Sequence, residues 1–126
     1  MVKQTTNYRI VITLCHANGR AYACVPIHTH FPNIETAKKT ITEMQLNDIE
    51  NYGAISKRYD IYPFSRHKSE DDCFTWEYRN CMIHGNKNCN RFKTIYKGHK
   101  ISNRQRLDKA LNDIDRMFTN QEIMHS

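Results

Sequence analysis

Apolar and polar residues alternate on both sides of Asn18-Gly19, and this pattern predicts a β-hairpin over residues 8–29. Asn-Gly favours a two-residue type I′ turn, because both central positions of that turn need a positive φ. The turn sets a register that pairs Leu14 with Ala23, Ile12 with Val25, Ile10 with Ile27, Thr13 with Cys24, Val11 with Pro26 and Arg9 with His28. The first three pairs are apolar and share one face, which we expect to be buried. Proline cannot donate a ladder hydrogen bond, so the second strand is expected either to lie at a sheet edge or to stop at Pro26.

Two later segments have the i, i+3, i+4 spacing of apolar residues that is typical of a helix with one buried face. The first is 33–46, with Asn33 as the N-cap and with Ile34, Ala37, Ile41 and Met44 facing inward. The second is 103–118, with Leu107, Ala110, Leu111, Ile114, Met117 and Phe118 facing inward. Ser102 and Gln105 fit a capping box, which predicts that the second helix begins near residue 103.

Three more strands are predicted, at 54–62, 73–84 and 90–97, the last two joined by a loop at 85–89. The apolar pattern favours a register that sets Met82 opposite Phe92 and Tyr78 opposite Tyr96. That register buries Trp76, Tyr78, Phe92 and Tyr96, although the same aromatic residues could instead form a stacking platform for bases. It exposes Arg79, Arg91, Lys93 and Lys97 on the opposite face, partly offset by Glu77.

The predicted order is β-β-α-β-β-β-α, which indicates an α+β fold in a single domain, 1–126. We expect an antiparallel sheet of about five strands with both helices packed on one face, which leaves the other face free for a partner. Residues 63–72 have no periodicity and are expected to form the one long loop. In element order, the strand-turn-strand-helix segment 73–118 resembles sheet-type DNA-binding modules such as those of some phage integrases.

The composition is that of a soluble globular protein, with 126 residues, 39% of them hydrophobic and 25% charged. No apolar run reaches the roughly 18–20 residues of a membrane helix, and the N-terminus lacks the features of a signal peptide. Five cysteines are an odd number, and without a secretion signal they favour reduced thiols. We therefore expect a cytoplasmic protein.

The positive charge is concentrated in one segment. Residues 87–109 hold eight Lys and Arg residues against the single acid Asp108, whereas the whole chain has a net charge of +6. The attraction of an anionic partner is therefore expected to originate in this segment. Six of its basic residues together with Arg79 form the predicted binding set, namely Arg79, Arg91, Lys93, Lys97, Lys100, Arg104 and Arg106.

Two small sites are further candidates. Cys73, Cys81, His84 and Cys89 have residue types that bind zinc, but no paired C-x2-C motif accompanies them, and scattered reduced cysteines are the favoured interpretation. Arg9, His28 and His30 could hold a small anion such as a nucleotide, or could form an ordinary polar strand end. No nucleophile motif or phosphate-binding glycine loop is present, so we expect no catalysis, no cofactor and no bound metal.

Two functional hypotheses remain. The favoured one is a small non-enzymatic protein that engages nucleic acid or a nucleoprotein complex through its basic sheet face and the start of its last helix. The alternative is a phage or other viral or mobile-element accessory protein that inhibits a host enzyme or defence complex by protein contact. Its anchors would be Tyr62, Phe64 and the edge at 28–31.

Overall fold

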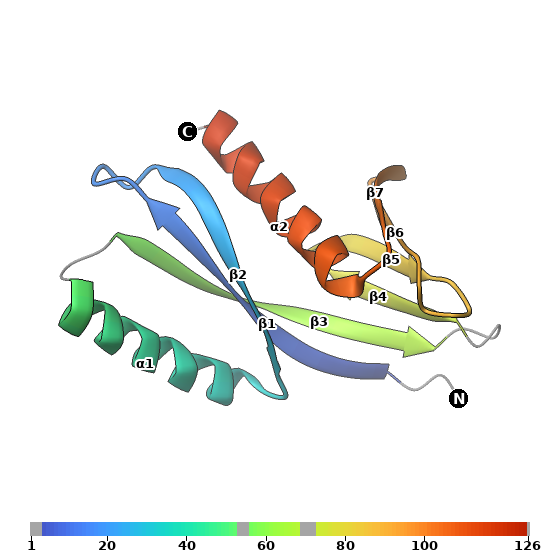
Figure 1. Cartoon of the computed structure of the whole chain (residues 1–126), viewed down its shortest axis with the longest axis horizontal. Helices are drawn as coiled ribbons and strands as arrows, with labels where there is room; N and C mark the ends of the chain where they lie inside the picture. Colours follow the sequence, from blue (N-terminus) through green and yellow to red (C-terminus); the bar gives the residue numbers. More distant parts are fainter. Residues whose placement is uncertain (1–3, 53–55, 69–72, 126) are drawn as a thin grey trace. The chain divides into compact units, whose positions relative to one another are not determined.

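The computed structural model describes residues 4–52, 56–68 and 73–125. In these residues the elements are β1 (Gln4–Cys15), β2 (Ala21–Phe31), α1 (Ile34–Tyr52), β3 (Lys57–Lys68), β4 (Phe74–Tyr78), β5 (Cys81–Gly85), β6 (Phe92–Tyr96), β7 (His99–Arg104) and α2 (Leu107–Met124) (Figure 1). The strands form one sheet in the order β2-β1-β3-β4-β5-β6-β7. The α+β class is confirmed, but the prediction of about five strands in the order β-β-α-β-β-β-α is wrong.

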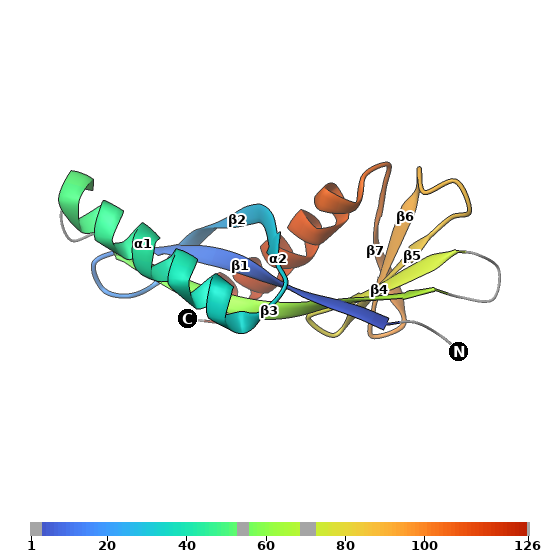
Figure 2. The ribbon, with the colours of Figure 1, turned by 90° about the horizontal axis from the view of Figure 1, so that it is seen from below.

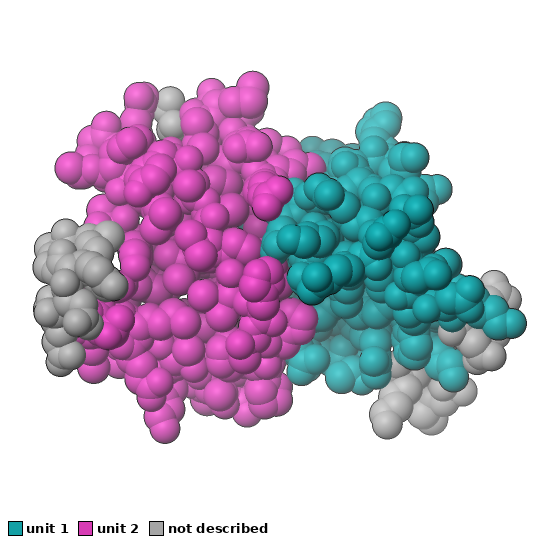
Figure 3. Space-filling view, in the orientation of Figure 1, with its two compact units in different colours: residues 1–7, 63–114 teal, residues 8–62, 115–126 magenta. Residues whose placement is uncertain are grey.

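The chain divides into two compact units, which Figure 3 colours separately. Unit 1 comprises residues 1–7 and 63–114, and unit 2 comprises residues 8–62 and 115–126. The expectation of a single domain stays a prediction.

In unit 2 the first hairpin keeps the predicted register through its middle, where Val11 to Leu14 pair with Pro26 to Ala23. The turn differs from the prediction: Gly19 alone has a positive φ, of 86°, and the loop holds three residues closed by a hydrogen bond from the His16 amide to the Arg20 carbonyl. Beyond Val11 a bulge shifts the pairing, so Arg9 lies opposite His30 rather than His28. The position of β2 at the sheet edge is confirmed.

Helix α1 and the part of α2 that belongs to unit 2, residues 115–124, lie on opposite faces of β1, which corrects the expectation that both helices pack on one face. Figure 1 and Figure 2 show α1 running along the strands of this unit. Its Ala37, Ile41 and Met44 pack with Ile10 and Ile12, whereas Ile34, predicted inward, is exposed. On the other face Arg9 is bonded to Asp115 of α2. Residues 9–13 of β1 are accordingly buried on both faces of the strand.

The N-cap of α1 is confirmed, because the Thr36 amide donates a hydrogen bond of 2.8 Å to Oδ1 of Asn33. The helix continues past the predicted end at residue 46 to Tyr52. Its last turns are joined to β3 in unit 2: Asp48 accepts hydrogen bonds from the Lys57 ammonium, at 2.9 Å, and from the Tyr59 hydroxyl.

In unit 1 the segment predicted as one strand is the hairpin β4-β5. Arg79 and Asn80 have φ values of 49° and 64°, which are the positive values of a type I′ turn. The turn reverses the alternation, so Tyr78 and Cys81 are both buried. The following pairs are Gly85 with Phe92, His84 with Lys93, Ile83 with Thr94, Met82 with Ile95 and Cys81 with Tyr96. The predicted register, with Met82 opposite Phe92, is wrong.

A second tight turn in unit 1, at Lys97-Gly98, produces the strand β7, which the sequence analysis did not predict. Ser102 pairs with Thr94 in this ladder and so cannot cap a helix. Helix α2 begins at Leu107 instead, with its first hydrogen bond from the Ala110 amide to the Arg106 carbonyl.

Aromatic side chains form much of the core of unit 1. Phe64, Trp76, Tyr78 and Phe92 are all less than 8% exposed, with Trp76 and Phe92 ring centroids 5.5 Å apart. The interpretation of Trp76, Tyr78 and Phe92 as core residues rather than a stacking platform is confirmed, and Tyr96 is half-buried. Residues 63–68, expected in a loop, continue β3 through Pro63, and the rest of that predicted loop, 69–72, lies outside the described residues.

No helix in the described ranges is long and apolar enough to cross a membrane.

Candidate functional site

Two adjoining hollows in unit 1 gather most of the predicted basic residues. The larger, of about 540 Å³, lies at the end of the β5-β6 hairpin and extends to β7. The smaller, of about 300 Å³, lies where β7 leads into α2. Arg91 and Asn103 line both hollows, so we treat them as one basic groove. Its lining residues are His84, Gly85, Asn86, Arg91, Lys93, Asn103, Arg104, Gln105, Arg106 and Lys109.

The loop between β5 and β6 positions Arg91. Oδ1 of Asn86 accepts hydrogen bonds from the Asn90 and Arg91 amides at 2.9 and 3.1 Å, and the Asn86 amide donates to the Arg91 carbonyl at 3.1 Å. An asparagine side chain that takes two backbone amides substitutes for part of a strand ladder. The backbone of Arg91 is therefore held at the mouth of the groove while its side chain is exposed.

Strand pairing brings three polar side chains into one row across the sheet. His84 lies directly opposite Lys93, and Lys93 lies directly opposite Asn103. All three side chains are exposed, and Nδ1 of His84 lies 3.4 Å from Oγ1 of Thr75 on β4. The alternation of the strands therefore directs this row away from the buried face that holds Ile83.

Two of the cations in the groove are paired within the protein. Arg104 donates to both oxygens of Asp113, at 2.7 and 2.9 Å, and these hydrogen bonds raise its pKa. Arg106 forms an ion pair of 3.2 Å with Asp108. Exposed pairs of this kind are weak and can exchange one partner for another.

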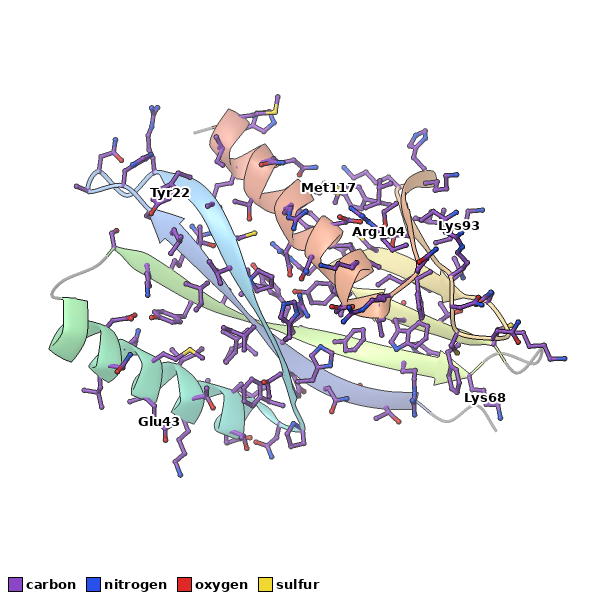
Figure 4. The ribbon with its side chains drawn as sticks, in the orientation of Figure 1. Tyr22, Glu43, Lys68, Lys93, Arg104 and Met117 are labelled. Atoms are coloured by element: carbon purple, nitrogen blue, oxygen red, sulfur yellow. The ribbon has the colours of Figure 1, made fainter. Side chains whose placement is uncertain are left out.

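The other three cations of the groove are Arg91, Lys93 and Lys109. Within the described part of the chain, their side chains form no ion pair with an acid, and all three are exposed. Like charges brought together without acids create a positive potential that is available to an anionic ligand. Figure 4 labels two residues of the groove, Lys93 on β6 and Arg104 on β7.

The predicted binding set is only partly gathered. Arg91, Lys93, Arg104 and Arg106 line the groove, whereas Arg79 and Lys97 occupy the two tight turns and Lys100 lies opposite Ile95 on β7. The sequence analysis missed Asn103 and Gln105, which it assigned to the start of the helix. It also omitted Lys109 from the binding set, although the charge of segment 87–109 includes it.

The predicted anion site in unit 2 is divided between the interior and the surface. Arg9 is fully buried and donates from Nε to Oδ2 of Asp115 at 3.2 Å. Its guanidinium is therefore already bonded to a carboxylate of the protein. His30 lies opposite Arg9, and burial, followed by the charges of Arg9 and His28, lowers its pKa. His28 is exposed. The arrangement resembles a structural ion pair more than an open ligand site.

The proposed zinc ligands are not brought together. Cys81 is completely buried, in contrast to its expected outward position, and His84 points to the opposite, exposed face. Cys89 is exposed in the loop with a φ of 53°. No group of three or more potential ligand residues that could hold a metal occurs in the residues that the structure describes.

Of the suggested anchors for a protein partner, the two phenylalanines are internal. Phe31 and Phe64 are 7% and 5% exposed, so neither side chain can insert into a partner in this conformation. Tyr62 is half-buried.

Comparison with models of protein families, with curated proteins and with solved structures found no match for this chain. The inference of function therefore depends on the geometry and charge of the basic groove.

Proposed function

We propose that the protein binds nucleic acid, alone or in a nucleoprotein complex, through phosphate contacts in the basic groove. The observation that carries this proposal is the convergence of Arg91, Lys93 and Lys109 on two adjoining hollows, with no ion pair to an acid in the described residues. A polyanion supplies the missing negative charge at several points at once, which a single small anion cannot do.

The paired arginines would strengthen such binding. Arg104 and Arg106 are exposed and are held at the groove by partly buried carboxylates, and a phosphate can share those contacts at small cost. Guanidinium groups bind phosphate oxygens with two parallel hydrogen bonds, so these arginines are suited to this exchange.

Titration with labelled DNA and RNA tests the proposal. If Arg91, Lys93 and Lys109 neutralise three phosphates, log K should fall with log salt concentration with a slope of about −2.7 on duplex DNA, or about −2.1 on single strands. The measurement is fluorescence anisotropy at several salt concentrations.

The test variant is Arg91→Glu with Lys93→Glu, which reverses two exposed charges of the groove. Its matched control is Lys38→Glu with Lys39→Glu, the same charge change at exposed positions of α1. We expect the groove variant to lose binding and the control to keep most of it. Equal losses in both would indicate attraction by net charge alone, and an absence of binding to every nucleic acid at low salt would refute the proposal.

A further inference from the structure

The two hollows of the basic groove differ in chemistry. The larger hollow contains the imidazole of His84 and the amide of Asn103, which offer both hydrogen-bond donors and acceptors. The smaller shares Arg91 and Asn103 with it and adds Gln105 and three cations, Arg104, Arg106 and Lys109, which offer only donors and positive charge. The first set suits the edge of a base and the second suits a phosphate.

The size of the larger hollow also distinguishes between ligands. Its volume of about 540 Å³ falls in the range of roughly 300–1,000 Å³ that is typical of pockets for small molecules. Bases in a duplex are stacked and paired, so an intact duplex presents only its backbone and groove edges and cannot fill such a hollow. An unpaired base can leave the stack and enter.

Arg91 lies at the junction, since it lines both hollows. None of the lining residues is Phe, Tyr or Trp, so the large aromatic rings on which many single-strand binders stack bases are lacking in this groove. A guanidinium plane can take this role, because bases also stack on arginine. The Arg91 side chain is exposed and forms no ion pair within the described residues, which leaves its plane available.

We infer that the basic groove accepts an unpaired nucleotide, with its base in the larger hollow against Arg91 and a phosphate in the smaller one. The ligand is then a single strand or a single-stranded end, not a continuous duplex. This inference rests on the proposed function and adds to it the class of nucleic acid.

The experiment compares oligonucleotides of one sequence, about 16 nucleotides long, as a single strand, a blunt duplex and a duplex with a single-stranded end. We expect the single strand and the duplex with the end to bind at least about tenfold more tightly than the blunt duplex, as stacking of one base predicts. Each oligonucleotide is tested as DNA and as RNA, and tighter binding of the single strand in either form supports the inference.

Two variants that keep the net charge test the geometry of the groove. Arg91→Lys retains the positive charge but loses the planar group, and Asn103→Leu replaces a hydrogen-bonding amide by an apolar side chain inside the hollow. Each should weaken single-strand binding about tenfold while the affinity for blunt duplex stays the same. The control for the second is Asn88→Leu, the same change at an exposed loop position that does not line the groove.

The outcomes separate this inference from the proposed function. If the blunt duplex binds as tightly as the single strand, or if Arg91→Lys and Asn103→Leu leave single-strand affinity unchanged, the inference is overturned. The proposed function still stands in that case, provided that Arg91→Glu with Lys93→Glu abolishes binding. If no nucleic acid binds at all, both are overturned. Circular dichroism of each variant confirms that it is folded.

Discussion

Replacing Gly85 by alanine should destabilise unit 1, chiefly through contact with the indole of Trp76. A Cβ atom at this position would lie 2.8 Å from Cζ3 of Trp76 and 3.3 Å from the carbonyl oxygen of Phe74. Carbon atoms in favourable contact are about 3.5–4.0 Å apart, so the indole would have to retreat by about 0.7 Å or more. Phe74 and Phe92 limit that movement, since their ring centroids are 5.9 and 5.5 Å from that of Trp76.

The magnitude follows from two opposing terms. An extra methyl group in a packed core typically costs about 1–3 kcal/mol. The loss of glycine's freedom in the unfolded chain returns about 0.4–1 kcal/mol. We therefore expect Gly85→Ala to lower the free energy of unfolding by about 1–2 kcal/mol. For a chain of this length that corresponds to a fall in Tm of roughly 4–8 °C.

Urea denaturation followed by tryptophan fluorescence measures this change, because Trp76 is the one tryptophan of the chain. The decisive comparison uses Trp76→Phe, which removes the ring atoms that a Cβ would meet. In that background, followed by circular dichroism, Gly85→Ala should cost much less, because the contact with the indole is gone and that with the Phe74 carbonyl stays. A cost that is the same in both backgrounds, or no cost in the wild type, would refute the reasoning.

Three further predictions concern unit 2, and the first of them is compared with a variant in unit 1. Asp115→Asn should lower the free energy of unfolding by about 3 kcal/mol, because Arg9 would keep its buried charge without this carboxylate. Asp113→Asn, which breaks an exposed arginine pair on the same helix, should cost less than about 1 kcal/mol, and similar losses in urea denaturation of the two variants would contradict the argument. Gly19→Val should cost about 1–2 kcal/mol in a thermal melt, since its φ of 86° strains a β-branched residue although no atom obstructs a Cβ; an unchanged Tm would show that the loop can adopt another conformation. The pKa of His30 is lowered, so its neutral form contributes stability above about pH 6.5 that is lost as the pH falls and the unfolded chain takes up a proton. The Tm of the wild type should therefore fall between about pH 7.5 and 5.5 by more than that of His30→Asn, and parallel decreases would contradict this assignment.

Local turn chemistry decides how much of the fold could be predicted. Asn18-Gly19 identified the first hairpin, and the register of Val11 to Leu14 was right even though the loop has three residues. The irregularity at the loop explains this, because it shifts Cys15 opposite Ala21 and leaves the next pairs unchanged. The turn at Arg79-Asn80 carries no such signal, since an arginine rarely adopts a positive φ.

Because the turn at Arg79-Asn80 was not predicted, the predicted faces and register of the following strands in unit 1 were also wrong. Reading 73–84 as one strand reversed the expected orientation of Cys81 and Ile83, which are buried. Pro63 had a similar effect on β3, because a proline normally argues against the middle of a strand. Strand β7 was missed even though Lys97-Gly98 is a recognisable turn, because the capping pattern after it favoured a helix.

The candidate site was predictable in charge and not in geometry. The concentration of Lys and Arg in 87–109 identified Arg91, Lys93, Arg104 and Arg106 from composition alone. The addition of His84 and Asn103 required the true register of β5, β6 and β7, which depends on long-range pairing that the local sequence does not encode.

The irregular pairing of β2 has a consequence for self-association. An edge strand of 11 residues with exposed Tyr22 and Val25 is the kind of surface on which another chain can add a strand and begin an aggregate. Pro26 offers no amide to an incoming strand, and the bulge opposite residues 9–11 interrupts the straight run of the backbone. Only short stretches of β2, on either side of Pro26 and the bulge, can pair with an incoming strand. The same features that complicated the register therefore limit the addition of another strand at this edge.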